Sequence, residues 1–153
     1  MMSLVPRIVL KPAFSLVGFS CQSSQLDGNF ELLWGELADR FDEIPFVDPD
    51  FGYGAHLQQG SGWQYLAGLA VLRPGLVPDG MTLHHFDAHT YAVFAHRGRL
   101  HRLSKTIAAI FRDSLPDAGF KVIDGFYFEF FDDRYQPESE DSVVFIYVPV
   151  ETH

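Results

Sequence analysis

The sequence predicts an α+β fold with a duplicated βαββ unit, one antiparallel sheet, two helices on one face and a pocket between the halves. Three observations lead to this prediction: two segments with helical spacing of apolar residues, short β-prone segments around them, and a weak internal repeat. Helices that follow such strands cover one face of the sheet. At 153 residues the chain can bury its own core, so residues 1–153 are predicted to form a single domain.

The first predicted helix lies in the segment NFELLWGELADRF. Asn29 is a candidate N-cap residue, and Glu31 falls in the first turn, where an acidic side chain is favoured. Apolar residues recur at helical spacing and predict an amphipathic helix of about three to four turns. These residues are Phe30, Leu33, Trp34, Leu37 and Phe41.

The second predicted helix lies in RLHRLSKTIAAIFRDSL. Pro116 follows this segment and is predicted to end the helix, because proline lacks the N–H group that would continue it. His96 and His101 flank the start of the helix and are predicted to lie at the surface. The apolar face consists of Leu100, Leu103, Ile107, Ile110 and Phe111.

The remaining segments are predicted to be strands, because they are rich in β-branched and aromatic residues and are bounded by Gly, Pro, Asp or Ser. The segments IVLKPAFSLVGFS and MTLHHFDAHTYAVFA both predict a short strand, a polar turn and a longer strand, and each precedes a helix and two more strands. The predicted strands are 8–10, 15–20, 52–57, 63–72, 81–86, 90–96, 125–131 and 143–148.

Composition narrows the class of function. The formal net charge is −9, from 20 acidic and 11 basic residues, which disfavours direct binding of nucleic acid. No apolar run approaches the roughly 18 residues of a membrane span, so we expect no membrane partner and a cytoplasmic location. Cys21 is the only cysteine, which excludes an intramolecular disulfide and a multi-cysteine metal site.

The segment FYFEFFDDRY places Glu129 among aromatic side chains on a predicted strand. Because side chains alternate across a strand, Tyr127, Glu129 and Phe131 share one face. One interpretation is that this face is exposed to solvent. The other is that Glu129 is a fixed negative charge in an aromatic-lined cavity, where a positively charged ligand would compensate for its lost hydration.

The chain resembles the GyrI-like, or AraC-type effector-binding, family, which includes the ligand domains of multidrug-sensing regulators of the BmrR and Rob kind. The resemblance rests on the order and spacing of short segments along nearly the whole chain. These segments are KPAFSLVGFS, LLW, YGAHL, YLAGLAV, PDGMTLHHFDAHTYAVFAHRG, SLPDAGF, FEFFDDRYQP and VFIYVPV. The 153 residues contain no helix-turn-helix pattern, so the chain is similar to stand-alone members such as those of integron cassettes.

The resemblance implies a pocket for a lipophilic cationic small molecule, with a central glutamate at Glu129 and no cofactor. It also implies that aromatic residues line this pocket. A tryptophan on the inner face of an amphipathic helix is more often a core residue than a ligand contact, and both interpretations stay open for that position. The candidate lining residues are Tyr147, Trp34, Tyr53, Tyr65 and Tyr127.

Two other functions are compatible with the sequence. A glutamate in an aromatic pocket could act as the general base of a small hydrolase, because burial raises the proton affinity of a carboxylate. A gyrase-inhibitor-type protein-interaction module is the third class. His84 and His85 point to opposite faces of a strand, which disfavours a metal site. A homodimer is possible.

The charge predicts that the pure protein has no sequence-specific affinity for DNA, since a net charge of −9 repels the phosphate backbone. A gel-shift titration at physiological salt should show no retarded band. A discrete complex that survives excess non-specific competitor would contradict this prediction.

Overall fold

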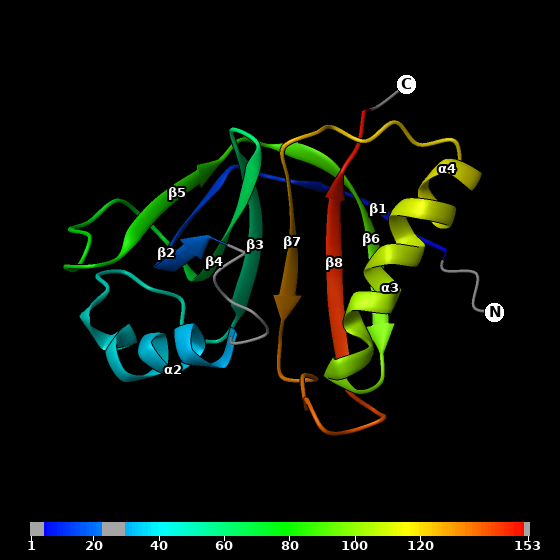
Figure 1. Ribbon diagram of the computed structural model, residues 1–153. Coiled ribbons are helices and arrows are strands. Elements are labelled where there is room, and N and C mark those ends of the chain that lie inside the picture. Colours follow the sequence, from blue (N-terminus) through cyan, green and yellow to red (C-terminus); the bar gives the residue numbers. More distant parts are fainter. Residues whose placement is uncertain (1–4, 23–29, 152–153) are drawn as a thin grey trace. The chain divides into compact units, whose positions relative to one another are not determined.

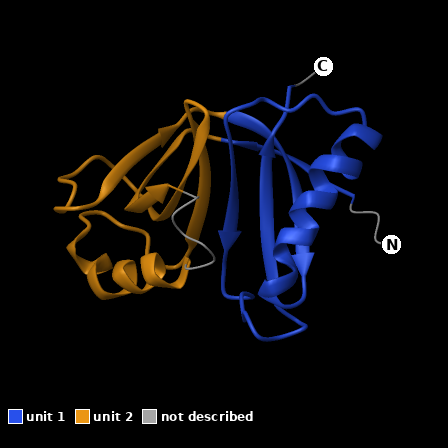
Figure 2. Ribbon diagram, viewed as in Figure 1, with its two compact units in different colours: residues 1–11, 89–153 blue, residues 12–88 orange. Residues whose placement is uncertain are grey.

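The computed structural model describes residues 5–22 and 30–151, and these form strands β1 to β8 and the helices labelled in Figure 1. The chain divides into two compact units (Figure 2). Unit 1 comprises Met1–Lys11 and His89–His153, and unit 2 comprises Pro12–Ala88. The predicted α+β class with antiparallel strands is confirmed.

Unit 2 contains an antiparallel sheet in the order β3-β4-β2-β5, with the α-helix α2 packed on it. Helix α2 covers the face that carries Val17, Tyr65 and Ala67, which we call the helix face of unit 2; the other side is its reverse face. The candidate N-cap Asn29 lies outside the described residues. The elements are β2 (Phe14–Gln22), α2 (Phe30–Arg40), the 3₁₀ turn η1 (Phe41–Glu43), β3 (Gly52–Gln59), β4 (Gly62–Val71) and β5 (Thr82–Phe86).

Unit 1 contains an antiparallel sheet in the order β1-β6-β8-β7 and a long helix that runs along it (Figure 1). The helix packs on the face that carries Phe94, Val144 and Ile146, which we call the helix face of unit 1; the other side is its reverse face. The elements are β1 (Arg7–Lys11), β6 (His89–Arg97), the 3₁₀ turn η2 (Leu100–Arg102), α3 (Leu103–Ala109), the π-helical turn η3 (Ile110–Ser114), α4 (Leu115–Asp117), β7 (Phe126–Phe131) and β8 (Val143–Pro149).

The prediction that Pro116 ends the second helix is wrong. The helix continues through Pro116 to Asp117, and the π-helical turn η3 lies directly before it. Within η3 the backbone leaves the regular α-helical hydrogen-bond pattern, so the missing N–H of Pro116 falls where α4 begins. The stop signal is Gly119, which has φ +76°. Its N–H donates to Pro116 O at 3.0 Å, and Phe120 N donates to Leu115 O at 3.1 Å, as in a Schellman cap.

The predicted repeat is confirmed: each half runs from a short strand to a longer strand, a helix and two more strands. The structure adds an exchange that the sequence did not indicate. Strand β1 of the first half pairs with β6 in unit 1, whereas β5 of the second half pairs with β2 in unit 2. Each half therefore contributes its short first strand to the other half's unit.

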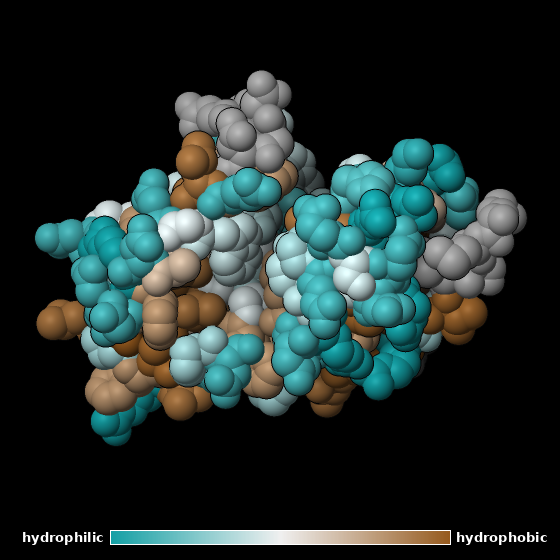
Figure 3. All heavy atoms as spheres, turned by 90° about the horizontal axis from the view of Figure 1, so that it is seen from below, coloured by the Kyte–Doolittle hydropathy of each residue, from teal (hydrophilic) through white to brown (hydrophobic). Residues whose placement is uncertain are grey.

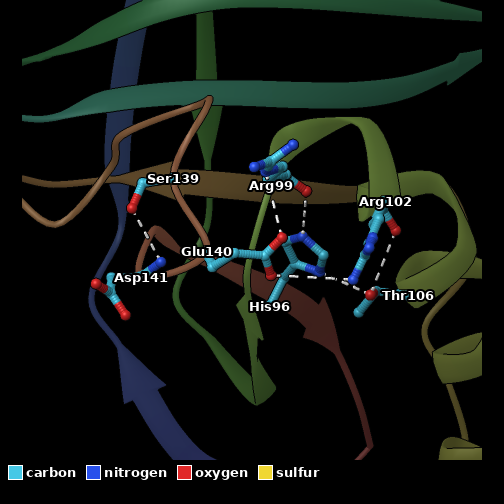
Figure 4. Close-up of polar contacts among 7 residues, drawn as sticks. All are labelled: His96, Arg99, Arg102, Thr106, Ser139, Glu140 and Asp141. Carbon is cyan, nitrogen blue, oxygen red and sulfur yellow. Dashed lines mark hydrogen bonds and ion pairs between the residues drawn. The ribbon is translucent and has the colours of Figure 1, made fainter.

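His96 is buried, with 4% of its surface exposed, so its predicted surface position is wrong. It lies at the end of β6, and its ring spans the start of the second helix (Figure 4). The Nε2–H group donates to the carbonyl oxygen of Arg99 at 3.0 Å, and Nδ1 lies 2.7 Å from the hydroxyl of Thr106. His96 thus links the end of β6 to the start of the second helix through both ring nitrogens.

The surface combines polar and apolar side chains, and hydrophobic atoms are visible on the side shown in Figure 3. Several large hydrophobic residues are exposed in unit 2, among them Phe46, Leu72 and Leu76. None of the helices in residues 5–22 and 30–151 is long and apolar enough to cross a membrane.

Two Gly-to-Ala changes in unit 2 should have opposite effects on the free energy of unfolding. Only the first of them lies at the contact between β2 and β4. A Cβ atom at Gly18 would overlap the carbonyl oxygen of Ala67 on β4, so Gly18→Ala should lower the free energy of unfolding by about 1–3 kcal/mol or more. Gly35 lies exposed inside α2 with no atom within 4 Å of such a Cβ. Gly35→Ala should raise the free energy of unfolding by about 1 kcal/mol. Urea denaturation of both variants measures these values, and equal effects would contradict the assigned β2–β4 contact.

Candidate functional site

Glu129 lies on the helix face of unit 1. Its neighbours on the same face of β7, Tyr127 and Phe131, both pack against the core beneath the long helix. Tyr127 makes an edge contact with Phe111 of the π-helical turn, with ring centroids 5.2 Å apart. Only 6% of Glu129 is exposed, so the interpretation of this residue as a solvent-facing glutamate is wrong.

The charge of Glu129 acts on the neighbouring tyrosine. The pKa of Tyr127 is raised above its ordinary value, first by burial of the phenol and second by the negative charge of Glu129. Both effects disfavour the phenolate, so Tyr127 stays a neutral hydroxyl next to the carboxylate. The helix face of unit 1 therefore carries a buried acid beside an uncharged aromatic ring.

Tyr147 lies on the opposite face of the same sheet. The register pairs it with Phe128, while Glu129 pairs with Ile146, which belongs to the core on the helix face. The ring of Tyr147 stacks on that of Phe128, with centroids 4.7 Å apart and planes at 13°. The structure therefore places Glu129 and Tyr147 on opposite faces of the sheet, although both were predicted to line one pocket.

Trp34 and Tyr65 lie together on the helix face of unit 2. The indole N–H of Trp34, on α2, donates to the hydroxyl of Tyr65, on β4, at 3.0 Å. The ring of Phe30 meets Tyr65 edge-on with centroids 4.5 Å apart, and His56 of β3 lies 5.1 Å from the same ring. Two of the predicted lining residues are thus in direct contact.

Tyr53 lies on the reverse face of unit 2. Its register partner is Gly68, which is offset by one position from Ala67 on the helix face. Its ring lies 5.6 Å from that of Phe14, which in turn stacks on Phe86 at 4.8 Å. Tyr53 therefore belongs to a separate aromatic group from Trp34 and Tyr65.

The sequence analysis missed Tyr91, which is fully buried on the reverse face of unit 1. Its ring contacts Phe128 at 5.3 Å and Tyr147 at 5.6 Å, centroid to centroid. Its hydroxyl has no hydrogen-bond partner among residues 5–22 and 30–151, and burial raises the pKa of this phenol. Strand alternation in TYAVFA could have indicated its face, but the sequence has no signal for the missing partner.

The described part of the chain assembles no metal site. No group of three or more His, Cys, Asp or Glu side chains there is placed to hold a metal ion. What the arrangement offers instead is one buried carboxylate beside aromatic rings on the helix face of unit 1. Carboxylates and the negative faces of aromatic rings are groups that attract cations in proteins.

Sequence comparison gives a match over almost the whole chain. The sequence profile of the GyrI-like small molecule binding domain matches residues 5–151. The transcriptional regulator BrlR of Pseudomonas aeruginosa is 35% identical over 147 residues. This alignment covers 94% of the chain but 54% of BrlR, so the chain spans about half the length of this curated relative.

Comparison with solved structures gives the same fold. The structure of SAV2435 bound to tetraphenylphosphonium superposes with a TM-score of 0.77 at 12% identity, covering 95% of this chain and 93% of SAV2435. The integron cassette protein VCH_CASS2, from the mobile metagenome of Vibrio cholerae, superposes with a TM-score of 0.61 at 17% identity, covering 98% of this chain and all of the other. At these identities the similarity shows a shared fold.

Two buried tyrosines should respond oppositely to loss of the hydroxyl group. Tyr65→Phe removes the acceptor of the Trp34 indole N–H and should lower the free energy of unfolding by about 1–2 kcal/mol. Tyr91→Phe removes a buried hydroxyl that has no partner in the described residues, so it should be neutral or stabilising. Both variants keep the ring, and urea denaturation compares them directly. A larger loss for Tyr91→Phe than for Tyr65→Phe would contradict the assigned hydrogen bonding.

Proposed function

The chain belongs to the GyrI-like small-molecule-binding family, and from this premise we propose that it binds lipophilic organic cations, with Glu129 as the charged anchor. The observation that carries the proposal is the burial of this carboxylate, of which 6% is exposed, among aromatic side chains. The tetraphenylphosphonium complex of SAV2435 supports the same ligand class, because that protein shares this fold.

The free energy of binding comes from two sources. An ionised carboxylate out of water is unfavourable by roughly several kcal/mol, and a cationic ligand offsets part of that penalty. Aromatic faces add about 2 kcal/mol or more for a desolvated cation in good geometry. Neutral ligands of equal shape should therefore bind more weakly.

The aromatic residues of the proposal differ in their support. Tyr127 shares the helix face of unit 1 with Glu129, and the charge of Glu129 helps to raise the pKa of its phenol. Trp34 and Tyr65 contact each other on the helix face of unit 2, and each needs its own variant to test for ligand contact. Tyr53 packs with Phe14 on the reverse face of unit 2, and Tyr147 stacks on Phe128 on the reverse face of unit 1.

The relationship to BrlR bears on biological role. BrlR is a transcriptional regulator, and the chain aligns with about half of it. We propose that this domain supplies ligand binding for sensing or sequestration, and that it does not itself contact DNA or need a cofactor. The proposed cellular location is the cytoplasm.

Glu129→Gln tests the anchor, because it keeps the shape of the side chain and removes its charge. Calorimetric titration with tetraphenylphosphonium should show affinity about tenfold lower or worse than in the wild type, which corresponds to about 1.4 kcal/mol. Affinity for the neutral analogue triphenylphosphine oxide should hold or rise. The control Glu138→Gln makes the same charge change at an exposed position of unit 1 and should leave both affinities unchanged.

Equal affinity of wild type and Glu129→Gln for the cation would overturn the anchor. The same samples incubated with labile esters distinguish a binder from a hydrolase that uses Glu129 as general base. Only a hydrolase releases product, and only then does Glu129→Gln abolish the release. Binding without turnover is the expected result.

A further inference from the structure

We propose that the reverse face of unit 1 carries a second ligand site, specific for organic anions that combine one acidic group with a flat apolar part. A cavity of about 300 Å³ lies on this face, lined by three arginines and by apolar residues of β6 and β8. This volume lies at the lower end for small-molecule sites. It is the opposite side of the sheet from Glu129, so the proposal is separate from the cation site.

The hollow is created by one small residue. On β6, Ala95 stands between Val93 and Arg97 on the reverse face and is itself exposed. The register places it opposite Phe145 of β8. A methyl group between longer side chains leaves a depression whose floor is apolar and whose wall includes an aromatic ring. A flat apolar group can fill that depression.

Two arginines supply the positive charge. Arg7 of β1 pairs in register with Val93, and Arg97 lies four positions further along β6, so both side chains leave the same face at different ends of the hollow. Both are exposed, and neither forms an ion pair within residues 5–22 and 30–151. In a chain with net charge −9, two uncompensated guanidinium groups beside one cavity favour an anion there.

Arg134 completes the wall in a different way. Its guanidinium group makes a two-pronged contact with Asp132, with Nε at 3.1–3.2 Å from both carboxylate oxygens. Its Cζ atom also lies 4.5 Å from the centroid of the Phe145 ring. Asp132 compensates the charge of Arg134, so Arg134 shapes the aromatic wall while Arg7 and Arg97 provide the net positive charge.

These features define the ligand by its chemistry. Guanidinium groups bind carboxylate, sulfonate and phosphate oxygens through directed hydrogen bonds. The floor formed by Val93 and Ala95, together with the Phe145 ring in the wall, favours an apolar group attached to that anion. An inorganic anion would contact only the arginines, and a neutral aromatic compound would contact only the apolar part of the cavity. A ligand that carries both an acidic group and an apolar group should bind more tightly than either.

The probe is 2-naphthoate, followed by calorimetry and by backbone amide NMR shifts. Binding should shift amides of β1, β6 and β8 around the cavity. The double variant Arg7→Gln/Arg97→Gln should weaken binding about tenfold or more, and Ala95→Met, which fills the hollow without changing charge, should weaken it as strongly. The matched control is Arg112→Gln, an exposed arginine that pairs with Asp113 on the long helix. It should bind like the wild type.

Three results would contradict the proposal, each at a different point. If inorganic sulfate shifts the same amides with the affinity of 2-naphthoate, the site takes simple anions and the amphipathic proposal is wrong. The neutral analogue 2-naphthylmethanol should bind at least about tenfold more weakly, and equal affinity would overturn the role of the arginines. Unchanged binding by the Ala95→Met variant would overturn the role of the cavity. Folding of each variant is checked by its amide spectrum.

The two sites should also be independent. Glu129→Gln should leave 2-naphthoate affinity unchanged, because Glu129 lies on the other face of the sheet. The double arginine variant should in turn leave tetraphenylphosphonium affinity unchanged. A loss of 2-naphthoate binding in Glu129→Gln would place both probes in one site and overturn the second site, whereas failure of the cation titration alone would leave it standing.

Discussion

The register between β7 and β8 decides which side chains each face of unit 1 carries. It pairs Glu129 with Ile146 and Phe128 with Tyr147, so the acid faces the helix and the stacked aromatic pair faces the other way. A slip of one residue would exchange these faces and bring Glu129 out of the core. The opposite charge preferences proposed for the two faces both depend on this pairing.

Burial of the acid has to be supported by its surroundings. Glu129 lies between Tyr127 and Phe131 on a strand whose core contacts come from the long helix. The π-helical turn in that helix brings Phe111 against Tyr127, and such turns recur at functional sites in other proteins. The irregular turn, the neutral tyrosine and the buried carboxylate therefore form one connected feature of unit 1.

Family membership and geometry contribute different parts of the functional argument. Membership in the GyrI-like family establishes a small-molecule-binding domain, and the resemblance points to Glu129. Geometry then separates residues that the resemblance had grouped together. Trp34 and Tyr65 are hydrogen-bonded on one face of unit 2, while Tyr53 packs with Phe14 on the other. The cavity beside Arg7 and Arg97 had no counterpart in the sequence analysis.

The sequence by itself determined the class of fold and the order of the elements, and it singled out Glu129 as a candidate site residue. Those features are local: apolar spacing marks a helix, alternation marks a strand, and an acid within an aromatic strand is visible in a few residues. Only the tertiary structure decided the exchange of β1 and β5, the burial of His96 and the separation of Tyr147 from Glu129. The strand exchange and the face of Tyr147 depend on which distant strands pair and in what register, which free energies from contacts far apart in the chain decide. The burial of His96 depends on its contacts with Arg99 and Thr106 at the start of the second helix.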